Sequence, residues 1–272
     1  MKMPHNTKLP FFSYGIFKPQ QLCYFRIRDM VKSTRDVEVD GMLKAREGIP
    51  MLVLSQGTKT KGVLIQFTEG KETEAYKRIT EAEPDEVYCW GEVIATNNVS
   101  ANTLIGKVTD KDNSDLEEYI EWDGEPDPYF NEALEEIEEI IYNIRLERNY
   151  KTFFHLQMAY FLLWNGLERY ANLRYHLGKN IHEKVLQIAQ EKAFAESLKK
   201  HVKGKREIYS LADISKYILD PNNPEKSIQY YSQIRSITLN RGKAFLQDFE
   251  IMKYSLIELL EIFKDLLKDA SK

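Results

Sequence analysis

The first hundred residues of the chain contain short apolar runs that are interrupted at close intervals. From Phe11 to about Val108, runs of β-forming residues at 51–54, 62–67 and 88–94 alternate with residues that favour turns. Two segments with helical spacing lie among them, at about 20–31 and 71–80. The pattern predicts a closed or strongly curved mixed sheet with a few helices. The turn signals are Gly41, Gly48-Ile49-Pro50, Gly57, Gly62, Gly70, Pro84 and Gly91.

Helical spacing replaces the strand pattern from Tyr129 onward. In 129–148 apolar residues recur on one face and glutamates occupy the other, which indicates an amphipathic helix. Residues 151–178 are apolar on nearly every side, as in a helix buried in a bundle, and Gly178 is placed to end it.

The remaining helices are predicted from the same spacing. Ser210–Asp213 has the composition of a helix start, and the short helix that it begins would end before Pro221. Together with the preceding segments, these helices predict an all-α bundle of four or five helices over 129–270. The other helical segments are 181–201, 225–240 and 243–268.

An acidic stretch separates the two patterns. Residues 110–128 carry nine Asp or Glu residues against one Lys, so we expect a solvated linker at 109–128. Tyr119, Ile120 and Trp122 indicate that part of this stretch packs on a domain. The chain is therefore predicted to be an α+β protein with a β domain at 11–108 and a helical domain at 129–270.

The composition is that of an ordinary globular protein. The 272 residues are 43% hydrophobic and 29% charged, and a net charge of −4 argues against attraction of the whole protein to nucleic acid or membranes. The longest apolar run, 158–164, is far too short to span a membrane. Cys23, Cys89 and the N-terminal sequence, which has no signal-peptide pattern, predict a cytoplasmic protein with reduced thiols. The histidines lack metal-ligand spacing, so we expect neither a metal nor a cofactor.

The segment FSYGIFKP at 12–19 is a candidate ligand-binding loop. Gly15 lacks a Cβ and suits a tight turn after the apolar residues Phe11 and Phe12. A turn at the end of a first strand can present backbone N–H groups to an anionic group. A plain hairpin turn has the same signature, so the octapeptide alone leaves both interpretations open.

Five motifs follow this loop in a characteristic order. They are Gly41-Met-Leu-Lys, Gly48-Ile-Pro-Met-Leu-Val, Lys61-Gly-Val-Leu-Ile-Gln, Ile79-Thr-Glu-Ala-Glu-Pro and Tyr88-Cys-Trp-Gly-Glu-Val-Ile. Together with the loop, the order resembles the γ-glutamylcyclotransferase-like family, also called AIG2-like, over residues 11–108. The resemblance implies a small mixed β-barrel-like domain that takes a small ligand of γ-glutamyl type.

The resemblance also implies roles for particular residues. The loop residues Tyr14, Gly15, Ile16 and Phe17 would offer backbone N–H groups to the α-carboxylate of the ligand, and Glu83 would be the general acid/base. One carboxylate can accept a proton from the α-ammonium and return one to the departing amine, provided that burial raises its pKa. Because ring closure is intramolecular, positioning supplies much of the rate.

The loop departs from the pattern of that family at two positions. Ile16 and Phe17 replace the usual small hydroxyl residue and Leu, so a different ligand is an alternative. Glu81, two residues before Glu83, is an alternative candidate for the carboxylate role. A solvated loop glutamate is the plain structural interpretation of Glu83.

A second constellation lies in the helical part. Arg235 stands on an otherwise apolar stretch, Asn240 follows after four residues, and Arg241 and Lys243 come next. With LLWNGLERY at 162–170, this pattern resembles the HEPN domain, a helical-bundle family with many ribonucleases that carry an Arg-x4–6-His motif. The resemblance covers about 129–270 and implies a homodimer in which the motifs of two protomers meet, with the Arg stabilising phosphate charge.

Asn240 occupies the expected position of the His. Asn cannot act as a general base at neutral pH, which weighs against RNA cleavage by the usual route and leaves phosphate or nucleotide binding open. Residues 191–243 carry eleven Lys or Arg against six Asp or Glu, so Arg241, Lys243 and Tyr231 are candidates for RNA binding. An ordinary solvated helix surface explains the same charges.

Three functions fit these observations. The favoured one is an effector of host defence or a toxin–antitoxin system, in which the β domain binds a small ligand and the helical domain binds or processes RNA. The second is a γ-glutamylcyclotransferase that uses the helical domain for dimerisation. The third is a catalytically silent binding or assembly protein. Asn240 counts against a ribonuclease, Ile16 counts against an ordinary cyclotransferase, and Glu83 counts against a silent protein.

Overall fold

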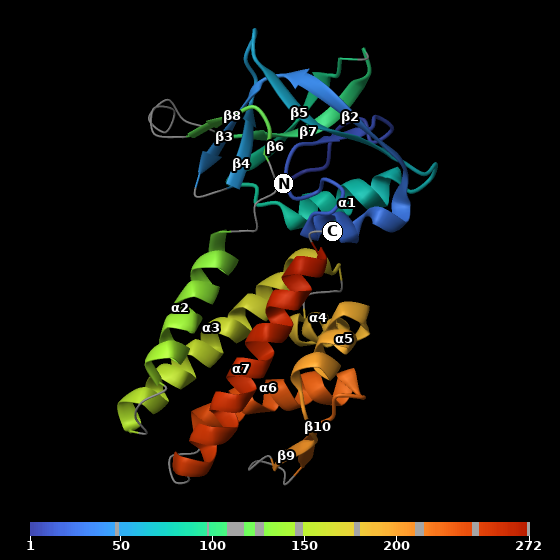
Figure 1. Ribbon diagram of the computed structural model, residues 1–272. Coiled ribbons are helices and arrows are strands. Elements are labelled where there is room, and N and C mark those ends of the chain that lie inside the picture. The colour runs from blue at the N-terminus through green and yellow to red at the C-terminus, as the bar shows by residue number, and fades with distance from the viewer. Residues whose placement is uncertain are drawn as a thin grey trace. The chain divides into compact units, whose positions relative to one another are not determined.

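The chain folds into two compact units, Met1–Pro128 and Tyr129–Lys272. Strands dominate the first unit and helices the second, so the protein is of the predicted α+β class (Figure 1). Among the described residues, no helix is both long and apolar enough to cross a membrane. The computed structural model describes residues 1–46, 49–96, 98–107, 117–122, 128–144, 149–176, 180–209, 215–240 and 245–270.

The main sheet of the first unit has five strands in the order β2-β5-β1-β7-β6. Strand β1 lies at its centre, antiparallel to β5 and parallel to β7. The two edge strands meet where Val39 pairs with Ala95, so the sheet curves back on itself. The strands are β1 (Phe11–Ser13), β2 (Val31–Asp40), β5 (Lys59–Phe67), β6 (Tyr88–Ile94) and β7 (Ser100–Gly106).

A smaller sheet has the order β4-β3-β8, with β3 at Met42–Arg46, β4 at Ile49–Val53 and β8 at Glu117–Tyr119. Strand β8 comes from the acidic stretch, and Trp122 just after it is buried in the core, as its aromatic character predicted. Ile120, in contrast, is 68% exposed. Residues 117–122 of the predicted linker therefore belong to the first unit.

The alternation of side chains along β1 divides the core of this unit into two layers. Phe12 packs on one face with Leu43, Leu52 and Trp122. Phe11 packs on the other face, with edge-to-face ring contacts to Tyr76 and Trp90. Tyr76 lies on helix α1 (Glu72–Ala82), which runs along this side of the sheet (Figure 1). Because successive side chains of a strand point to opposite faces, Phe11 and Phe12 lie in two different apolar layers.

The segment after β1 is helical, but it is not the single α-helix that the spacing at 20–31 predicted. It forms two short 3-10 helices, η1 (Leu22–Arg26) and η2 (Arg28–Met30). Cys23 and Arg26 are buried three residues apart, a spacing that one turn of 3-10 helix brings to the same side.

The second unit is built around α3 (Tyr150–Arg174). Its N-terminus is fixed by a capping box between Asn149 and Thr152, and its middle is buried on most sides, as predicted. Helix α7 (Phe245–Ala270) packs against it, and the Phe263 ring lies 5.6 Å from that of Phe130 on α2 (Pro128–Ile144). The remaining α-helices are α4 (Ile181–Gln187), α5 (Lys192–His201) and α6 (Pro224–Asn240).

Two features of this unit differ from the prediction. The helix expected at 181–201 is broken by the 3-10 turn η3 (Ile188–Gln190), so the described residues of this unit contain six α-helices, α2 to α7, instead of four or five. Strands β9 (Arg206–Tyr209) and β10 (Lys216–Leu219) form an antiparallel pair, and β10 lies where the short helix ending before Pro221 was expected, so the unit is not all-α. Each strand has only four residues, which is too few for the spacing of apolar side chains to distinguish a ribbon from a helix. Ser210–Asp213 and Gly178 lie outside the described residues.

Candidate functional site

Glu83 directly follows helix α1, where its N–H donates to the carbonyl of Ile79 at 3.3 Å. The side chain is partly buried. Burial raises the pKa of its carboxyl to about 7, and the nearby positive charge of Arg26 acts against this rise. A carboxyl in this range accepts and releases protons near neutral pH.

Two buried tyrosines lie close enough to Glu83 to feel its charge. The Tyr14 hydroxyl donates to the Leu104 carbonyl at 2.7 Å, and the Tyr88 hydroxyl donates to the Pro50 carbonyl at 2.8 Å. Burial raises the pKa of both phenols, and the charge of Glu83 raises it further. Both hydroxyls therefore stay protonated, which leaves Glu83 as the group of this cluster that can titrate near neutral pH.

The loop 14–17 forms a turn, in which the N–H of Lys18 donates to the carbonyl of Gly15 at 2.9 Å. A Cβ on Gly15 would lie 3.2 Å from Cγ of Pro50, so glycine permits the close approach of the two segments. Within the part of the chain that the structure describes, the N–H groups of Gly15, Ile16 and Phe17 donate to no backbone carbonyl. Three backbone donors of the loop are thus without a backbone acceptor among the described residues, and ligand binding by the loop stays a prediction.

The two unusual residues of the loop point into apolar surroundings. The Phe17 ring is buried, with its centroid 6.1 Å from that of Phe11. Ile16 packs against the core cluster that contains Tyr14 and Trp122. Their side chains therefore stabilise the loop, and the backbone remains its polar part.

Arg26 is the residue of this site that the sequence analysis missed. It ends η1, is only 6% exposed, and its charge reaches both Glu83 and Glu81. The signal in the sequence was weak: a single Arg at helical spacing among apolar residues, between Cys23 and Ile27.

In the second unit, Arg235 is engaged with α3. Its guanidinium forms an ion pair with Glu168 at 3.1 Å and lies 5.9 Å from the centre of the Trp164 ring. Trp164 also donates its indole N–H to Glu168 at 2.8 Å. These contacts orient the Arg235 side chain, which is still 41% exposed.

The other predicted residues of that constellation lie at the end of α6, outside the described residues, or in the core. Asn240 is the last residue of α6, and Arg241 and Lys243 lie outside the described residues. Tyr231 is completely buried, and its carbonyl accepts a hydrogen bond from the Tyr160 hydroxyl at 2.8 Å. Its ring is thus part of the helical core and does not form a surface for RNA.

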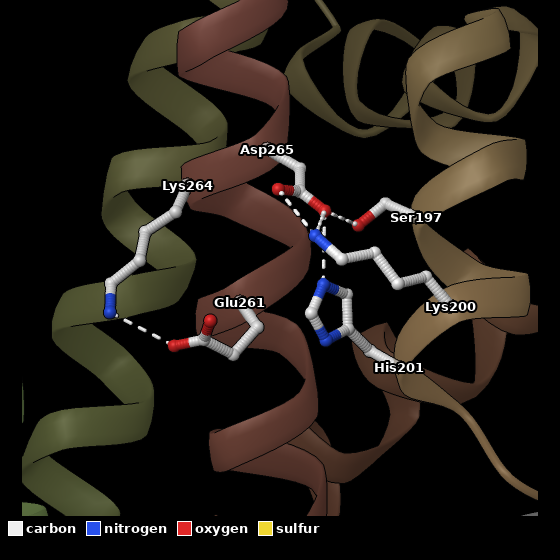
Figure 2. A network of polar contacts seen from close by, with 6 residues as sticks. All are labelled: Ser197, Lys200, His201, Glu261, Lys264 and Asp265. Atoms are coloured by element: carbon white, nitrogen blue, oxygen red, sulfur yellow. Dashed lines mark hydrogen bonds and ion pairs between the residues drawn. The ribbon is translucent and has the colours of Figure 1, made fainter.

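A polar network between α5 and α7 contains Ser, His and Asp but does not have the geometry of a catalytic triad (Figure 2). Ser197 donates its hydroxyl to Asp265 at 2.8 Å, and His201 Nε2 lies 3.0 Å from the same carboxylate oxygen. Lys200 reaches both oxygens of Asp265. Because the Ser hydroxyl is directed to the carboxylate and not to the imidazole, no base activates it. The network links two helices.

Asp265→Asn is expected to destabilise this link in a pH-dependent way. Partial burial acts to raise the pKa of Asp265, but hydrogen bonds from Ser197, Lys200 and His201 outweigh it and hold the pKa at about 2. The ionised carboxylate therefore stabilises the fold above its ordinary pKa of 3.8, and this contribution disappears as the pH falls through about 2.

At pH 7 the Asn variant should lose about 1–2 kcal/mol of unfolding free energy, measured by urea denaturation. The difference from the unchanged protein should shrink between about pH 4 and pH 2. Asp269→Asn, one turn further along α7 and exposed, is the control and should change little. A loss that is the same at pH 2.5 and pH 7 would contradict the assignment.

No model of a known protein family matches the sequence, and no curated protein or solved structure matches it either. Within the described ranges, no group of three or more His, Cys, Asp or Glu side chains is arranged to hold a metal ion. Neither the buried Cys23 nor the half-buried Cys89 forms a disulfide within the described residues.

Proposed function

We propose that the first unit binds a small molecule of γ-glutamyl type and that Glu83 catalyses its cyclisation. The observation that carries this proposal is a carboxyl of raised pKa within electrostatic reach of a loop in which the N–H groups of Gly15, Ile16 and Phe17 donate to no backbone carbonyl of the described residues. Tyr14 joins the two parts, because it begins the loop and lies within electrostatic reach of Glu83. The resemblance to γ-glutamylcyclotransferase-like proteins and the curved sheet, whose edges meet at Val39 and Ala95, support the same function.

The reaction needs one carboxyl group that acts twice. Ionised Glu83 accepts a proton from the α-ammonium of the substrate, and the amine then attacks its own γ-carbonyl carbon. A new C–N bond closes the five-membered ring while the C–N bond to the leaving amine breaks. Protonated Glu83 gives its proton to that amine, and the ring nitrogen releases its second hydrogen to water as a proton, so the products are 5-oxoproline, a free amine and a proton. The N–H groups of the loop hold the α-carboxylate in place.

A product assay tests this proposal. The purified chain should release 5-oxoproline and amine in equal amounts from at least one member of a panel of γ-glutamyl amines and γ-glutamyl amino acids, measured by mass spectrometry. A panel that covers small, aromatic and cationic amines addresses the effect of Ile16 on the choice of ligand. Absence of 5-oxoproline across the whole panel would contradict the proposed reaction.

RNA binding by the second unit is a second proposed function, which would make the chain an effector of the host-defence or toxin–antitoxin type. It is favoured by Arg235, whose guanidinium is oriented by Glu168 and Trp164 and remains 41% exposed. A homodimer is supported by exposed apolar side chains one turn apart on α3, at Tyr150, Phe154 and Met158.

Arg235→Ala is expected to weaken RNA binding by about tenfold or more if this guanidinium contacts phosphate, because a charge-assisted hydrogen bond is lost. Arg235→Lys should keep part of the affinity. Fluorescence anisotropy with a labelled single-stranded RNA at two salt concentrations measures both variants. Lys226→Ala, which removes a positive charge near the other end of the same helix, is the matched control. Equal affinities for Arg235→Ala and the unchanged protein would exclude Arg235 from the RNA site.

A further inference from the structure

Arg26 places a buried positive charge within electrostatic reach of Glu83, and no carboxylate of the described residues is paired with it. Within the described part of the chain, its Nε donates no hydrogen bond although the atom is inaccessible to solvent. No carboxylate among the described residues forms an ion pair with it, and the charges of Glu83 and Glu81 act on it only from a longer distance. Burial lowers the pKa of the guanidinium, as expected for a charge that has been removed from water and not paired.

This arrangement is unfavourable for the empty protein. A buried charge without a partner destabilises a fold, and natural proteins retain such groups mainly where they serve another purpose. The fold nevertheless fixes the backbone of Arg26, because Arg78 on α1 donates to the Arg26 carbonyl at 2.8 Å. The hydrogen bond to its carbonyl therefore fixes the backbone of Arg26, whereas the Nε of its side chain makes no hydrogen bond within the described residues that would do so.

The backbone donors near Glu83 also lack a backbone acceptor within the described ranges. The N–H groups of Gly15, Ile16 and Phe17 have no backbone acceptor in the described residues, and the loop that carries them lies beside Glu83 through Tyr14. The Arg26 guanidinium and these three N–H groups are all donors that a negatively charged acceptor would satisfy. Neutral Glu83 does not supply it, since a carboxyl group with a proton is a weak acceptor.

We propose that Arg26 binds an anionic group of the ligand, and that it thereby selects acidic over neutral ligands. For the γ-glutamyl-type substrate of the proposed function, on which the identity of the ligand rests, this group is the α-carboxylate. When the carboxylate binds, it neutralises the charge of Arg26, which is the charge that acts to keep Glu83 ionised. Ligand binding thus makes Glu83 a better proton acceptor for the step that follows.

The test compares two ligands that differ only in charge. 5-Oxoproline carries a carboxylate, and 5-oxoprolinamide carries a neutral amide on the same ring. Isothermal titration calorimetry should show that the unchanged protein prefers 5-oxoproline, and that Arg26→Met reduces this affinity about tenfold or more without changing the affinity for the amide. Arg26→Lys keeps the charge without the planar fork and should recover part of the preference.

The melting temperature separates a binding role from a structural one. Arg26→Met removes an unpaired buried charge and keeps an apolar side chain of similar length, so the empty protein should melt at the same or a higher temperature. Arg28→Gln removes a positive charge two residues away, where the side chain is exposed and stacks on Phe25, and it should leave the binding of 5-oxoproline unchanged. A fall of several degrees for Arg26→Met without ligand would make Arg26 a structural residue and overturn the inference.

The remaining outcomes distinguish the inference from the proposed function. If Arg26→Met releases and binds 5-oxoproline as the unchanged protein does, the cyclisation stands and the inference fails. If the unchanged protein neither releases nor binds 5-oxoproline, the proposed function fails, and acetate and inorganic phosphate become the probes. Stabilisation by either anion that Arg26→Met abolishes would then support the inference, and no stabilisation by any of them would overturn it.

Discussion

Replacement of Glu83 by Gln is expected to lower kcat for 5-oxoproline release by about 10²–10⁴-fold, with a much smaller change in KM. The amide has nearly the same volume as the carboxyl but cannot accept a proton from the α-ammonium. The loop 14–17 and Arg26, which are proposed to hold the substrate, are untouched by the change. Steady-state kinetics with the best substrate of the panel measure both constants.

The pH dependence of the unchanged protein should identify the same group. Because Glu83 must be ionised to act as the base and its pKa is about 7, kcat/KM should rise with pH and level off above about 7. An ordinary carboxyl would give this rise near 4.5. A profile that is flat between pH 5.5 and 8 would remove Glu83 from the proton transfer.

The raised pKa of Glu83 also predicts that stability falls with pH over the range in which activity rises. The folded pKa of Glu83 lies above its ordinary value of 4.5, so the unfolded chain ionises first as the pH rises. The carboxyl therefore reduces stability progressively between about pH 4.5 and 7. Glu83→Gln removes this penalty and should melt at the same or a higher temperature at pH 8, which would show that lost activity is not lost folding.

Glu81→Gln is the matched control for Glu83→Gln. Glu81 lies two residues earlier on α1, is exposed, and was the alternative carboxylate in the sequence. Its variant should keep kcat within about twofold of the unchanged protein, since removal of an exposed charge near Arg26 alters the local field only slightly. A large loss in Glu81→Gln with an active Glu83→Gln would reverse the assignment.

The elements that the sequence predicted well are those with a clear local pattern of apolar residues. Strand β6 occupies Tyr88–Ile94 as predicted, and α1 differs from its predicted range by one or two residues at each end. The amphipathic helix predicted from residue 129 is present as α2. Helices α1 and α2 each bury one apolar face, so the period in the sequence survives in the fold. Strand β6 places Trp90 beside Phe11 and buries Val93 in the cluster of Phe12, and its run of β-forming residues marks it.

The predictions that failed concern segments whose conformation depends on contacts distant in the sequence. The strand β8 in the acidic stretch forms because β3 offers a free edge, which no local pattern reveals. Strands β9 and β10 have four residues each, and the spacing of apolar residues in so short a segment fits a helix and a strand equally well. The break at Ile188–Gln190 directs Glu191 towards α3, and a long-range polar contact of this kind overrides local helix propensity.

In the candidate site, too, some residues could be predicted from the sequence and others could not. The resemblance to γ-glutamylcyclotransferase-like proteins implied that Glu83 and the loop 14–17 belong to one site, and in the structure Glu83 lies within electrostatic reach of Tyr14. Arg26 was missed because its importance arises from burial without a partner, which a sequence does not display. Tyr231 illustrates the reverse error, since an aromatic residue near basic residues has the same pattern whether it lies in the core or on the surface.

The largest effect on stability is expected for Glu191→Ala in the second unit. Glu191 directly precedes α5 and accepts hydrogen bonds from Tyr170 at 2.9 Å, from Arg174 Nε at 3.0 Å and from Tyr175. The side chains of Glu191 and Arg174 are only 10% and 11% exposed. Without the carboxylate, a buried guanidinium and two buried phenols lose their shared acceptor, which is expected to destabilise the unit by about 3–5 kcal/mol.

Urea denaturation followed by circular dichroism at 222 nm, which reports mainly on the helices, measures this change. Glu196→Ala removes an exposed glutamate on α5 that pairs with Lys192 at 3.4 Å, and it should change the unfolding free energy by no more than about 0.5 kcal/mol. If unpaired burial of Arg174 is the cause, the double variant Glu191→Ala with Arg174→Met should be more stable than Glu191→Ala alone. A double variant that is less stable would show that Arg174 stabilises the unit through packing and not through its bond to Glu191, because its long side chain would then contribute more as apolar surface than as a charge.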